Sequence, residues 1–193
     1  PENNERINRQ RELPITVIVG NPPYSAKQES ANDDNANEKY PHLDSAIRDT
    51  YAQRSTATLR NALYDSYIRA IKWASLRIGG KGIIAYVTNG AWLDSSAADG
   101  MRLSLADDFD AIHVYNLRGN ARTAGLQRQK EGGTVFDSGS RATVAITILV
   151  RDPSRTAPSA IYYSDIGDYH SRQDKLAIIA KVRAISGLTS APT

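Results

Sequence analysis

A run of β-branched residues, Ile15–Val19, ends abruptly at two consecutive prolines. A continuous β-branched run of this length is typical of a strand that a parallel sheet buries on both faces. Pro22 and Pro23 have no backbone N–H to donate to a neighbouring strand, so the strand must end before them. In open α/β sheets, ligands bind beyond the carboxyl ends of the strands. The sequence Asn21-Pro22-Pro23-Tyr24 is therefore predicted to lie where a ligand would bind.

Further strand and helix patterns alternate along the chain. Apolar residues between Leu59 and Ile78 recur at helical spacing, and Gly79-Gly80 is expected to end that helix. Shorter helices are predicted over Leu43–Ala52, after Asp94 or Ser95, and over Asp174–Ile185, and strands over Ile83–Val87, Ile112–Leu117, Val144–Val150 and Ile161–Tyr163. This alternation predicts an α/β fold with right-handed crossovers and a mostly parallel sheet. No clear helix precedes the Val144–Val150 strand, so we expect it to run antiparallel.

Composition and spacing divide the chain and exclude several classes of protein. We expect a linker or fraying helix over residues 1–13, one α/β unit over 14–152, and a linker with the start of a next module over 153–193. Without cysteine there are no disulfides or thiolate zinc sites, and the three separated histidines predict no metal site. The net charge of +3 does not by itself indicate a nucleic-acid binder. With no apolar run near the roughly 20 residues of a membrane helix, we expect a cytoplasmic protein.

The tetrapeptide Asn21-Pro22-Pro23-Tyr24 suits the alkylation of a planar exocyclic amine. Such a nitrogen is a poor nucleophile because its lone pair is delocalised into the ring. The side-chain carbonyl of Asn21 and the backbone carbonyl of Pro22 can accept its two N–H bonds and favour a pyramidal nitrogen. Consecutive prolines restrict the backbone, so both acceptors are held before the substrate arrives. Tyr24 offers a flat face on which an extruded base can stack. The alternative is a turn that merely ends the strand.

The residues around this tetrapeptide carry a family resemblance. VIVGNPPY, followed by LYDSYIRAIKWASLRIGGKGIIAYVTNGAWL, resembles motifs IV to VI of the amino-methyltransferases that use S-adenosylmethionine. Together with DGMRLSLADDFDAIHVYNLRGN, EGGTVFDSGSRATVAITILV and IYYSDIGDYHSRQDKLAII, nearly the whole chain is similar to the methyltransferase portion of single-polypeptide (type ISP) restriction–modification enzymes, often labelled helicases. The resemblance implies the carboxyl half of a Rossmann-like methyltransferase fold. It also implies transfer of a methyl group to N6 of a flipped adenine, with Asn21, Pro22, Pro23 and Tyr24 as catalytic residues.

The resemblance assigns roles to several residues outside the tetrapeptide. Tyr67 would lie near the adenosine of the cofactor, although core packing explains its helical spacing equally well. Phe136 matches the place of an aromatic that contacts the flipped base, and an ordinary loop aromatic is the alternative. Five basic residues could contact DNA phosphates, or could simply belong to a solvated loop: Arg118, Arg122, Arg128, Lys130 and Arg141.

The chain also departs from the family pattern. The glycine-rich cofactor loop and the acid that holds the ribose precede the tetrapeptide by tens of residues in the family, whereas 20 residues precede Asn21 here. No G-x-G-x-x-G and no Walker A motif occurs. We therefore expect a fragment that binds S-adenosylmethionine weakly or not at all and is inactive when isolated. Its partners would be double-stranded DNA and the rest of a polypeptide with a nuclease and a helicase-like ATPase. We also expect the Ile15–Val19 strand to be an open edge that self-associates or is filled by another segment.

Two other functions remain open at this point. One is N5 methylation of a protein glutamine, because the same tetrapeptide also serves amide nitrogens. The basic stretch between Leu117 and Lys130 and the likeness to restriction enzymes argue against it. The other is a non-catalytic module that positions DNA within a helicase-like translocase, although motor motifs are absent from the sequence.

Overall fold

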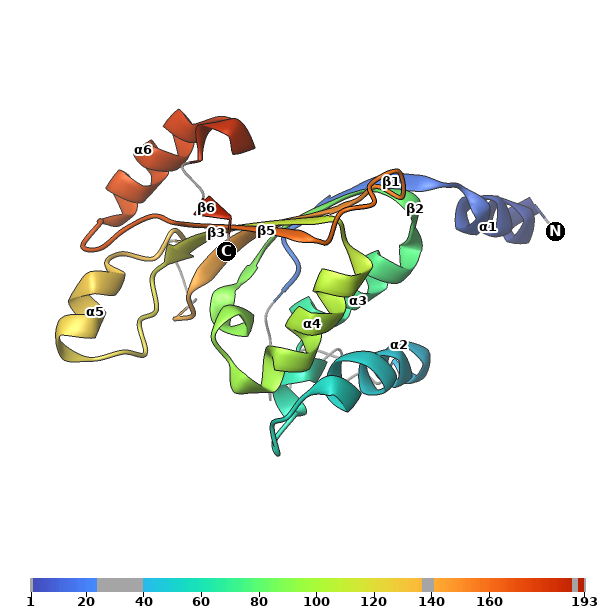
Figure 1. Cartoon of the computed structure of the whole chain (residues 1–193), viewed down its shortest axis with the longest axis horizontal. Coiled ribbons are helices and arrows are strands. Elements are labelled where there is room, and N and C mark those ends of the chain that lie inside the picture. Colours follow the sequence, from blue (N-terminus) through green and yellow to red (C-terminus); the bar gives the residue numbers. More distant parts are fainter. Residues whose placement is uncertain (1, 24–39, 137–140, 189–190, 193) are drawn as a thin grey trace.

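One mixed sheet organises the computed structural model, which describes residues 2–23, 40–136, 141–188 and 191–192 (Figure 1). The order across the sheet is β1-β2-β4-β3-β5-β6. The strands are β1 (Ile15–Gly20), β2 (Ile78–Asn89), β3 (Ala111–Arg118), β4 (Val144–Arg151), β5 (Ala160–Asp165) and β6 (Ala191–Pro192).

The strand directions agree with the fold class predicted from the sequence. β1 runs parallel to β2, and β3 runs parallel to β5. β4 lies between β2 and β3 and is antiparallel to both, so β1, β2, β3 and β5 all point the same way. The α/β fold with its antiparallel strand at Val144–Val150 is confirmed, and the arrangement is that expected for the carboxyl half of a Rossmann-like fold.

Helices cover the two faces of the sheet unequally (Figure 1). In Figure 1, α2, α3 and α4 lie below the sheet, α6 lies above one end of it, α5 lies beside that end, and α1 projects from the opposite end. The α-helices are α1 (Glu2–Glu12), α2 (Pro41–Ile47), α3 (Ser66–Arg77), α4 (Asp99–Asp108), α5 (Gly125–Glu131) and α6 (Arg172–Val182). The short helices are the π-helix η1 (Arg48–Ala52) and the 3₁₀ helices η2 (Asn61–Tyr64), η3 (Gly90–Leu93), η4 (Ser96–Ala98) and η5 (Ile185–Gly187).

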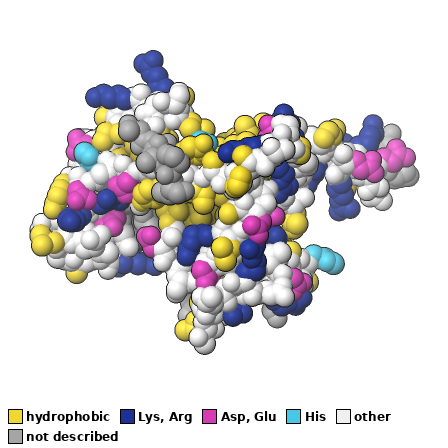
Figure 2. Space-filling model, in the orientation of Figure 1, with side chains coloured by type: hydrophobic (Ala, Val, Ile, Leu, Met, Phe, Trp, Pro, Cys, Tyr) yellow, Lys and Arg dark blue, Asp and Glu magenta, His cyan; other side chains and the backbone are white. Residues whose placement is uncertain are grey.

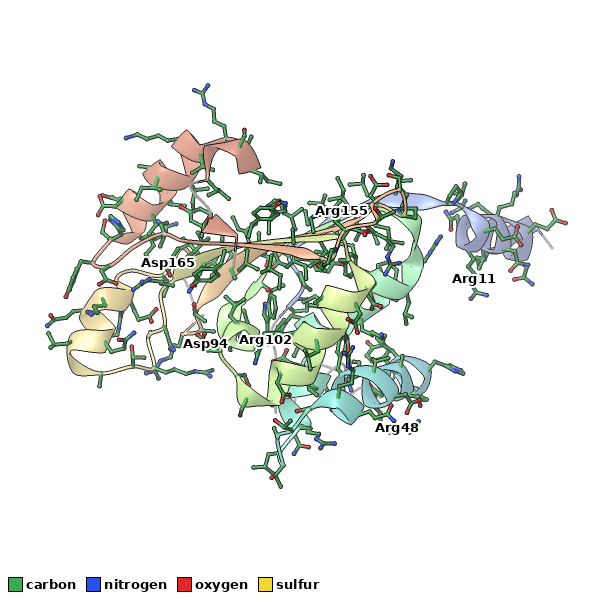
Figure 3. All side chains as sticks on the ribbon, viewed as in Figure 1. Arg11, Arg48, Asp94, Arg102, Arg155 and Asp165 are labelled. Atoms are coloured by element: carbon green, nitrogen blue, oxygen red, sulfur yellow. The ribbon has the colours of Figure 1, made fainter. Side chains whose placement is uncertain are left out.

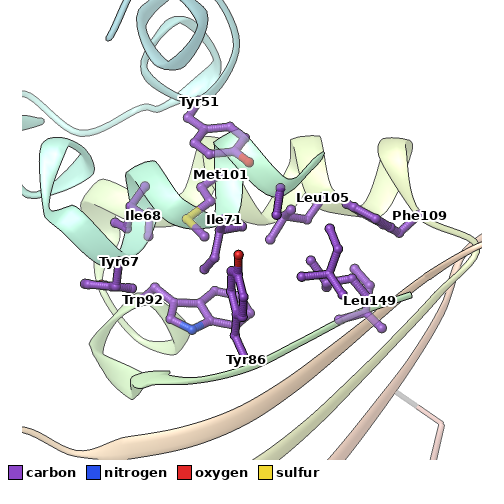
Figure 4. Close-up of a cluster of buried hydrophobic side chains, with 14 of the residues drawn as sticks. Tyr51, Tyr67, Ile68, Ile71, Tyr86, Trp92, Met101, Leu105, Phe109 and Leu149 are labelled. Atoms are coloured by element: carbon purple, nitrogen blue, oxygen red, sulfur yellow. The ribbon is translucent and has the colours of Figure 1, made fainter. Parts of the chain in front are cut away.

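The main core lies between the sheet and the layer of α2, α3 and α4 (Figure 4). As the apolar spacing predicts, α3 buries Tyr67, Ile71 and Ala74. Each large side chain so buried stabilises the fold by roughly 1.5–3 kcal/mol. The predicted helix end is wrong, because Gly79 and Gly80 lie inside β2. The helix ends at Arg77 and the backbone is already extended at Ile78 (φ −71°, ψ 131°), so no glycine cap is needed.

β1 is the outermost strand, and its burial differs from the prediction. Ile18 faces α3 and is 9% exposed, whereas Val17 and Val19 on the other face are 60% and 75% exposed. No helix of the described residues covers those two valines, and no described strand pairs with the outer edge of β1. The expectation of a strand buried on both faces is therefore wrong for this chain.

The exposed valines give a testable consequence for association. Replacing Val17 and Val19 by lysine should abolish self-association, because charged side chains on an edge strand oppose pairing with a second chain. We expect the unaltered chain to associate at about 100 μM and the double variant to sediment as a monomer. Leu103→Lys is the matched control, since Leu103 is an exposed leucine on α4, away from this edge. Sedimentation of the unaltered chain as a monomer throughout would contradict the expectation.

Both ends of the chain contain regular structure. Residues 2–12 form α1, and Arg77 holds its end: the Nη2 of Arg77 donates to the carbonyl of Gln10 at 2.9 Å and to that of Leu13, just after the helix, at 3.0 Å. β5 pairs with β3 along its whole length, so the segment after residue 153 extends the same sheet. A domain boundary at residue 153 stays a prediction. Within the described part of the chain, no helix has the length and apolar character needed to cross a bilayer.

Candidate functional site

The carboxyl end of β1 brings the predicted catalytic residues to the surface. Gly20 pairs with Tyr86 of β2, and a Cβ at Gly20 would lie 3.1 Å from Cε1 of the buried Tyr86 ring. This close approach favours glycine directly before Asn21. Asn21 is exposed, Pro22 is half-buried and Pro23 is exposed. The residues that carry both predicted acceptors therefore lie at the surface, whereas Tyr24 lies outside the described residues.

The loop after β2 is fixed beside this edge by hydrogen bonds that the sequence did not reveal. The side chain of Asn89 accepts from the backbone N–H of Ala91 at 2.9 Å and starts η3. Arg102 of α4 donates from Nη1 to the carbonyl oxygens of Trp92 (2.7 Å) and Ser95 (2.9 Å). Figure 3 shows Arg102 and Asp94 on the side of the sheet where α3 and α4 lie. These contacts fix the turn beyond β2, which lies at the same edge of the sheet as Asn21 because β1 and β2 are parallel neighbours.

Arg118, at the end of β3, is already engaged by two carboxylates. It donates from Nε to Asp165 at 2.6 Å and from Nη1 to Asp168. Burial alone would lower the pKa of Arg118, but the two carboxylates outweigh it and raise that pKa above its usual value. Figure 3 places Asp165 at the end of the sheet near α5. A DNA phosphate at Arg118 would have to compete with both carboxylates.

The other predicted phosphate contacts gather around α5 but differ in availability. Arg128 donates to the carbonyl of Gly132 at 2.6 Å, and the Lys130 amine lies 3.9 Å from Asp168. Arg122 and Arg141 are exposed, although they lie 19 positions apart in the sequence. The backbone N–H of Ala121 donates to the carbonyl of Arg141 at 3.0 Å, which brings the two arginines into the same small region. Arg141 also donates from Nη2 to the carbonyl of Ala121 at 3.5 Å, so its guanidinium is partly engaged, while both arginines remain exposed to an approaching anion.

Phe136 and Tyr67 occupy different surroundings. Phe136 is half-buried and packs against a second hydrophobic cluster formed by the ends of β3 and β4 with α6. Its carbonyl accepts from the hydroxyl of Thr134 at 2.6 Å. Tyr67 is 4% exposed in the main core, where burial, and secondarily the charge of Asp65, raises the pKa of its hydroxyl. This burial fits the packing alternative for Tyr67, and its cofactor role stays a prediction.

The surface at this end of the molecule is partly hydrophobic. Hydrophobic side chains gather between the α5–α6 end and the layer of α2–α4, on the face shown in Figure 2. Among the described residues, no group of three histidine, aspartate or glutamate side chains could hold a metal ion.

Nearly the whole chain is similar to segments of much longer proteins of known structure. No family model and no curated protein matches it. Among solved structures, a nuclease-deletion mutant of the type ISP restriction–modification enzyme LlaGI, in complex with a DNA substrate mimic, is 46% identical over 98% of this chain (TM-score 0.92). The ATP-dependent type ISP enzyme LlaBIII bound to DNA is 40% identical over 96% (TM-score 0.88), and DrdV in a DNA complex is 38% identical over 99% (TM-score 0.88). The chain spans 15%, 12% and 18% of those proteins, respectively.

Proposed function

We propose that this chain forms the amine-holding half of a DNA adenine-N6 methyltransferase within a restriction–modification enzyme. The observation that carries the proposal is the position of Asn21-Pro22-Pro23. These residues follow β1 directly at the carboxyl edge of the sheet, with Asn21 exposed and Pro22 half-buried. The similarity to segments of two type ISP restriction–modification enzymes, at 40% and 46% identity, supports it.

The chain's own residues act on the substrate amine. The side-chain oxygen of Asn21 and the carbonyl oxygen of Pro22 accept its two N–H bonds, which directs the nitrogen lone pair away from the ring. S-adenosylmethionine, when bound, supplies a sulfonium-linked methyl group as the electrophile. The nitrogen gains positive charge as the new N–C bond forms and the methyl–sulfur bond breaks, its electron pair remaining on a neutral thioether sulfur, and the two oxygens stabilise the charge on nitrogen. The alkylated amine then releases one proton to water, so no strong base is required.

The described residues fit the substrate side of this reaction better than the cofactor side. Tyr67, the residue that the family resemblance assigns to the cofactor, is packed into the core and presents no open ring face here. No glycine-rich loop of the G-x-G-x-x-G type occurs in the sequence. We therefore propose that other parts of a longer polypeptide hold most of S-adenosylmethionine, and that nuclease and ATPase functions belong to those parts as well.

Exposed arginines favour DNA over a peptide as the substrate. Arg122 and Arg141 are brought together beside α5, where a phosphate could approach both. Protein-glutamine methylation does not call for such a pair, because a peptide backbone carries no charge. A non-catalytic module that positions DNA would use the same arginines, but it gives no role to Asn21.

The proposal is tested by methyl transfer with the whole enzyme that contains this chain. Tritiated S-adenosylmethionine is supplied with unmethylated plasmid and phage DNA in one reaction and with glutamine-containing peptides in another. We expect label in DNA alone, recovered as N6-methyladenine after digestion to nucleosides. Label in peptide, or none in DNA under conditions where the enzyme binds it, would overturn the proposal.

A further inference from the structure

The segment that leads into Phe136 is bound along its length by the start of α6. The backbone N–H of Tyr169 donates to the carbonyl of Lys130 at 3.0 Å, and the N–H of Gly133 donates to that of His170 at 3.0 Å. Arg172 donates from Nε to the carbonyl of Val135 at 3.2 Å. Residues 130–135 therefore follow residues 169–172, although about 40 residues separate them in the sequence.

Backbone contact at two glycines makes this attachment close. Gly132 has a φ of +65°, and a Cβ there would overlap the carbonyl oxygen of His170. A Cβ at Gly133 would lie 2.5 Å from the backbone nitrogen of Arg172. No side chain fits between the two segments at these positions, so their main chains touch directly.

Lys175 of α6 is the buried polar centre of the attachment. Its amine donates to the carbonyl of Leu117 at 2.8 Å and to the carbonyl of Glu131 at 2.7 Å. The residue is fully buried. One acceptor lies next to the last residue of β3 and the other is the last residue of α5, so a single side chain of α6 joins three elements. Without an amine there, two buried carbonyls would lose their donor, which destabilises the attachment.

The surroundings of Lys175 show that burial is unfavourable for its charge. Burial lowers the pKa of the amine to about 8. Glu131 and Asp165 act against that shift, whereas Arg118 and Arg128 add to it. A neutral amine keeps two N–H donors, so both hydrogen bonds can persist when the proton is lost. An aliphatic residue would avoid the cost of burying a charge, but it would not hold the two carbonyls.

Phe136 belongs to the same hydrophobic cluster as the apolar side chains of α6. Val135 is buried, and Phe136 packs against the cluster to which Ile178, Ile179 and Val182 of α6 also belong. Because Phe136 follows the bound segment directly, its backbone can move only as far as residues 130–135 allow.

We propose that Lys175 is a positioning residue that holds residues 131–136 on α6 and so fixes the ring of Phe136 for contact with the flipped base. This inference rests on the proposed function for its substrate, but the attachment itself does not. It assigns a role in methyl transfer to a helix outside the expected methyltransferase unit, which was predicted to end at residue 152.

The first test measures the attachment in the full chain. Lys175→Met removes the donors while keeping the length of the side chain. Hydrogen exchange at the Gly133 amide should become at least about tenfold faster, while the amides of the β2–β4 ladder keep their rates. Lys181→Met is the matched control, since Lys181 is an exposed lysine on the same helix. Unchanged exchange at Gly133 would overturn the proposal. If Lys175→Met does not fold, Lys175→Gln, which keeps an N–H donor group, is judged by the same criterion with intermediate acceleration expected.

The second test measures coupling to Phe136 in the whole enzyme. We expect Lys175→Met and Phe136→Ala each to slow single-turnover methyl transfer, and the double variant to be no slower than Phe136→Ala. Multiplying effects would show that Lys175 does not act through Phe136 and would overturn the proposal. Failure of the proposed function is distinguishable, because Asn21→Ala would then leave the reaction unchanged whatever happens at residue 175.

Discussion

Replacing Asn21 by alanine should lower the rate of methyl transfer by the whole enzyme about 100- to 1,000-fold, the usual cost of losing one preorganised polar group that stabilises developing charge. The variant loses the side-chain acceptor that directs the amine lone pair. It keeps both prolines, so the backbone after β1 should hold its position. DNA affinity should change little, because Asn21 contacts one amine in the proposed complex. Single-turnover methyl transfer and DNA binding, measured on the same preparation, separate the two effects.

Two further variants sharpen this test. Asn21→Asp keeps an acceptor oxygen at the same place and should lose less activity than Asn21→Ala. Asn8→Ala removes an exposed asparagine on α1, which precedes the amino end of β1, whereas Asn21 follows its carboxyl end; this variant should leave the rate unchanged. If Asn21→Ala methylated DNA at the normal rate, the site would not be catalytic, and the chain would be a module that positions DNA.

The sequence predicted the strand before Asn21 but not that one face of this strand is exposed. A β-branched run is typical of a buried strand, and β1 does form where the run lies. Burial, however, depends on which elements cover the strand, and helices of the described residues cover one face of β1. Val17 and Val19 are therefore residues of a type usually found in a core, but they lie at the surface. This contrast is itself a physical reason to expect a covering partner.

Local signals located the helices better than they located the helix ends. The spacing of Tyr67, Ile71 and Ala74 identified α3 correctly. For α6, the predicted start at Asp174 is late, because the capping box of Ser171 and Asp174 begins the helix at Arg172. The signal was present in the sequence, since serine followed three residues later by an acidic residue is a common helix start. It is weak beside the apolar periodicity, which set the predicted bounds.

The attachment of Lys175 could not be predicted from sequence patterns. Its acceptors, Leu117 and Glu131, lie 58 and 44 positions away. A lysine beside apolar residues on a helix is usually exposed, whereas here Leu176 is exposed and Lys175 is buried. The contacts that bury Lys175 join α6 to residues distant in the sequence, which no local pattern reports. The pairing of β3 with β5 brings Asp165 to Arg118, so the electrostatics of this end of the sheet also depend on distant contacts.

The contact between α4 and η1 should be highly sensitive to an added side-chain atom. Gly100, in the first turn of α4, is buried, and a Cβ there would overlap the carbonyl oxygen of Tyr51 and lie 2.5 Å from the backbone nitrogen of Ser55. Both neighbours are backbone atoms, so they cannot turn aside as the end of a flexible side chain can. The segment is also tied down, because Asp99 accepts from the N–H and the hydroxyl of Thr56 at 2.8 and 2.6 Å.

Gly100→Ala should therefore lower the free energy of unfolding by about 3 kcal/mol, since an added methyl group in a closed contact forces the backbone apart. Gly80→Ala is the matched control, because a Cβ at Gly80 would meet no atom within 4 Å and the same substitution should change stability by about 0.5 kcal/mol or less. Urea unfolding followed by circular dichroism measures both variants. α4 supplies Arg102, which fixes the turn beside Asn21, so a displaced α4 should also slow methyl transfer by the whole enzyme. Equal stability of the two variants would show that α4 and η1 can separate without cost.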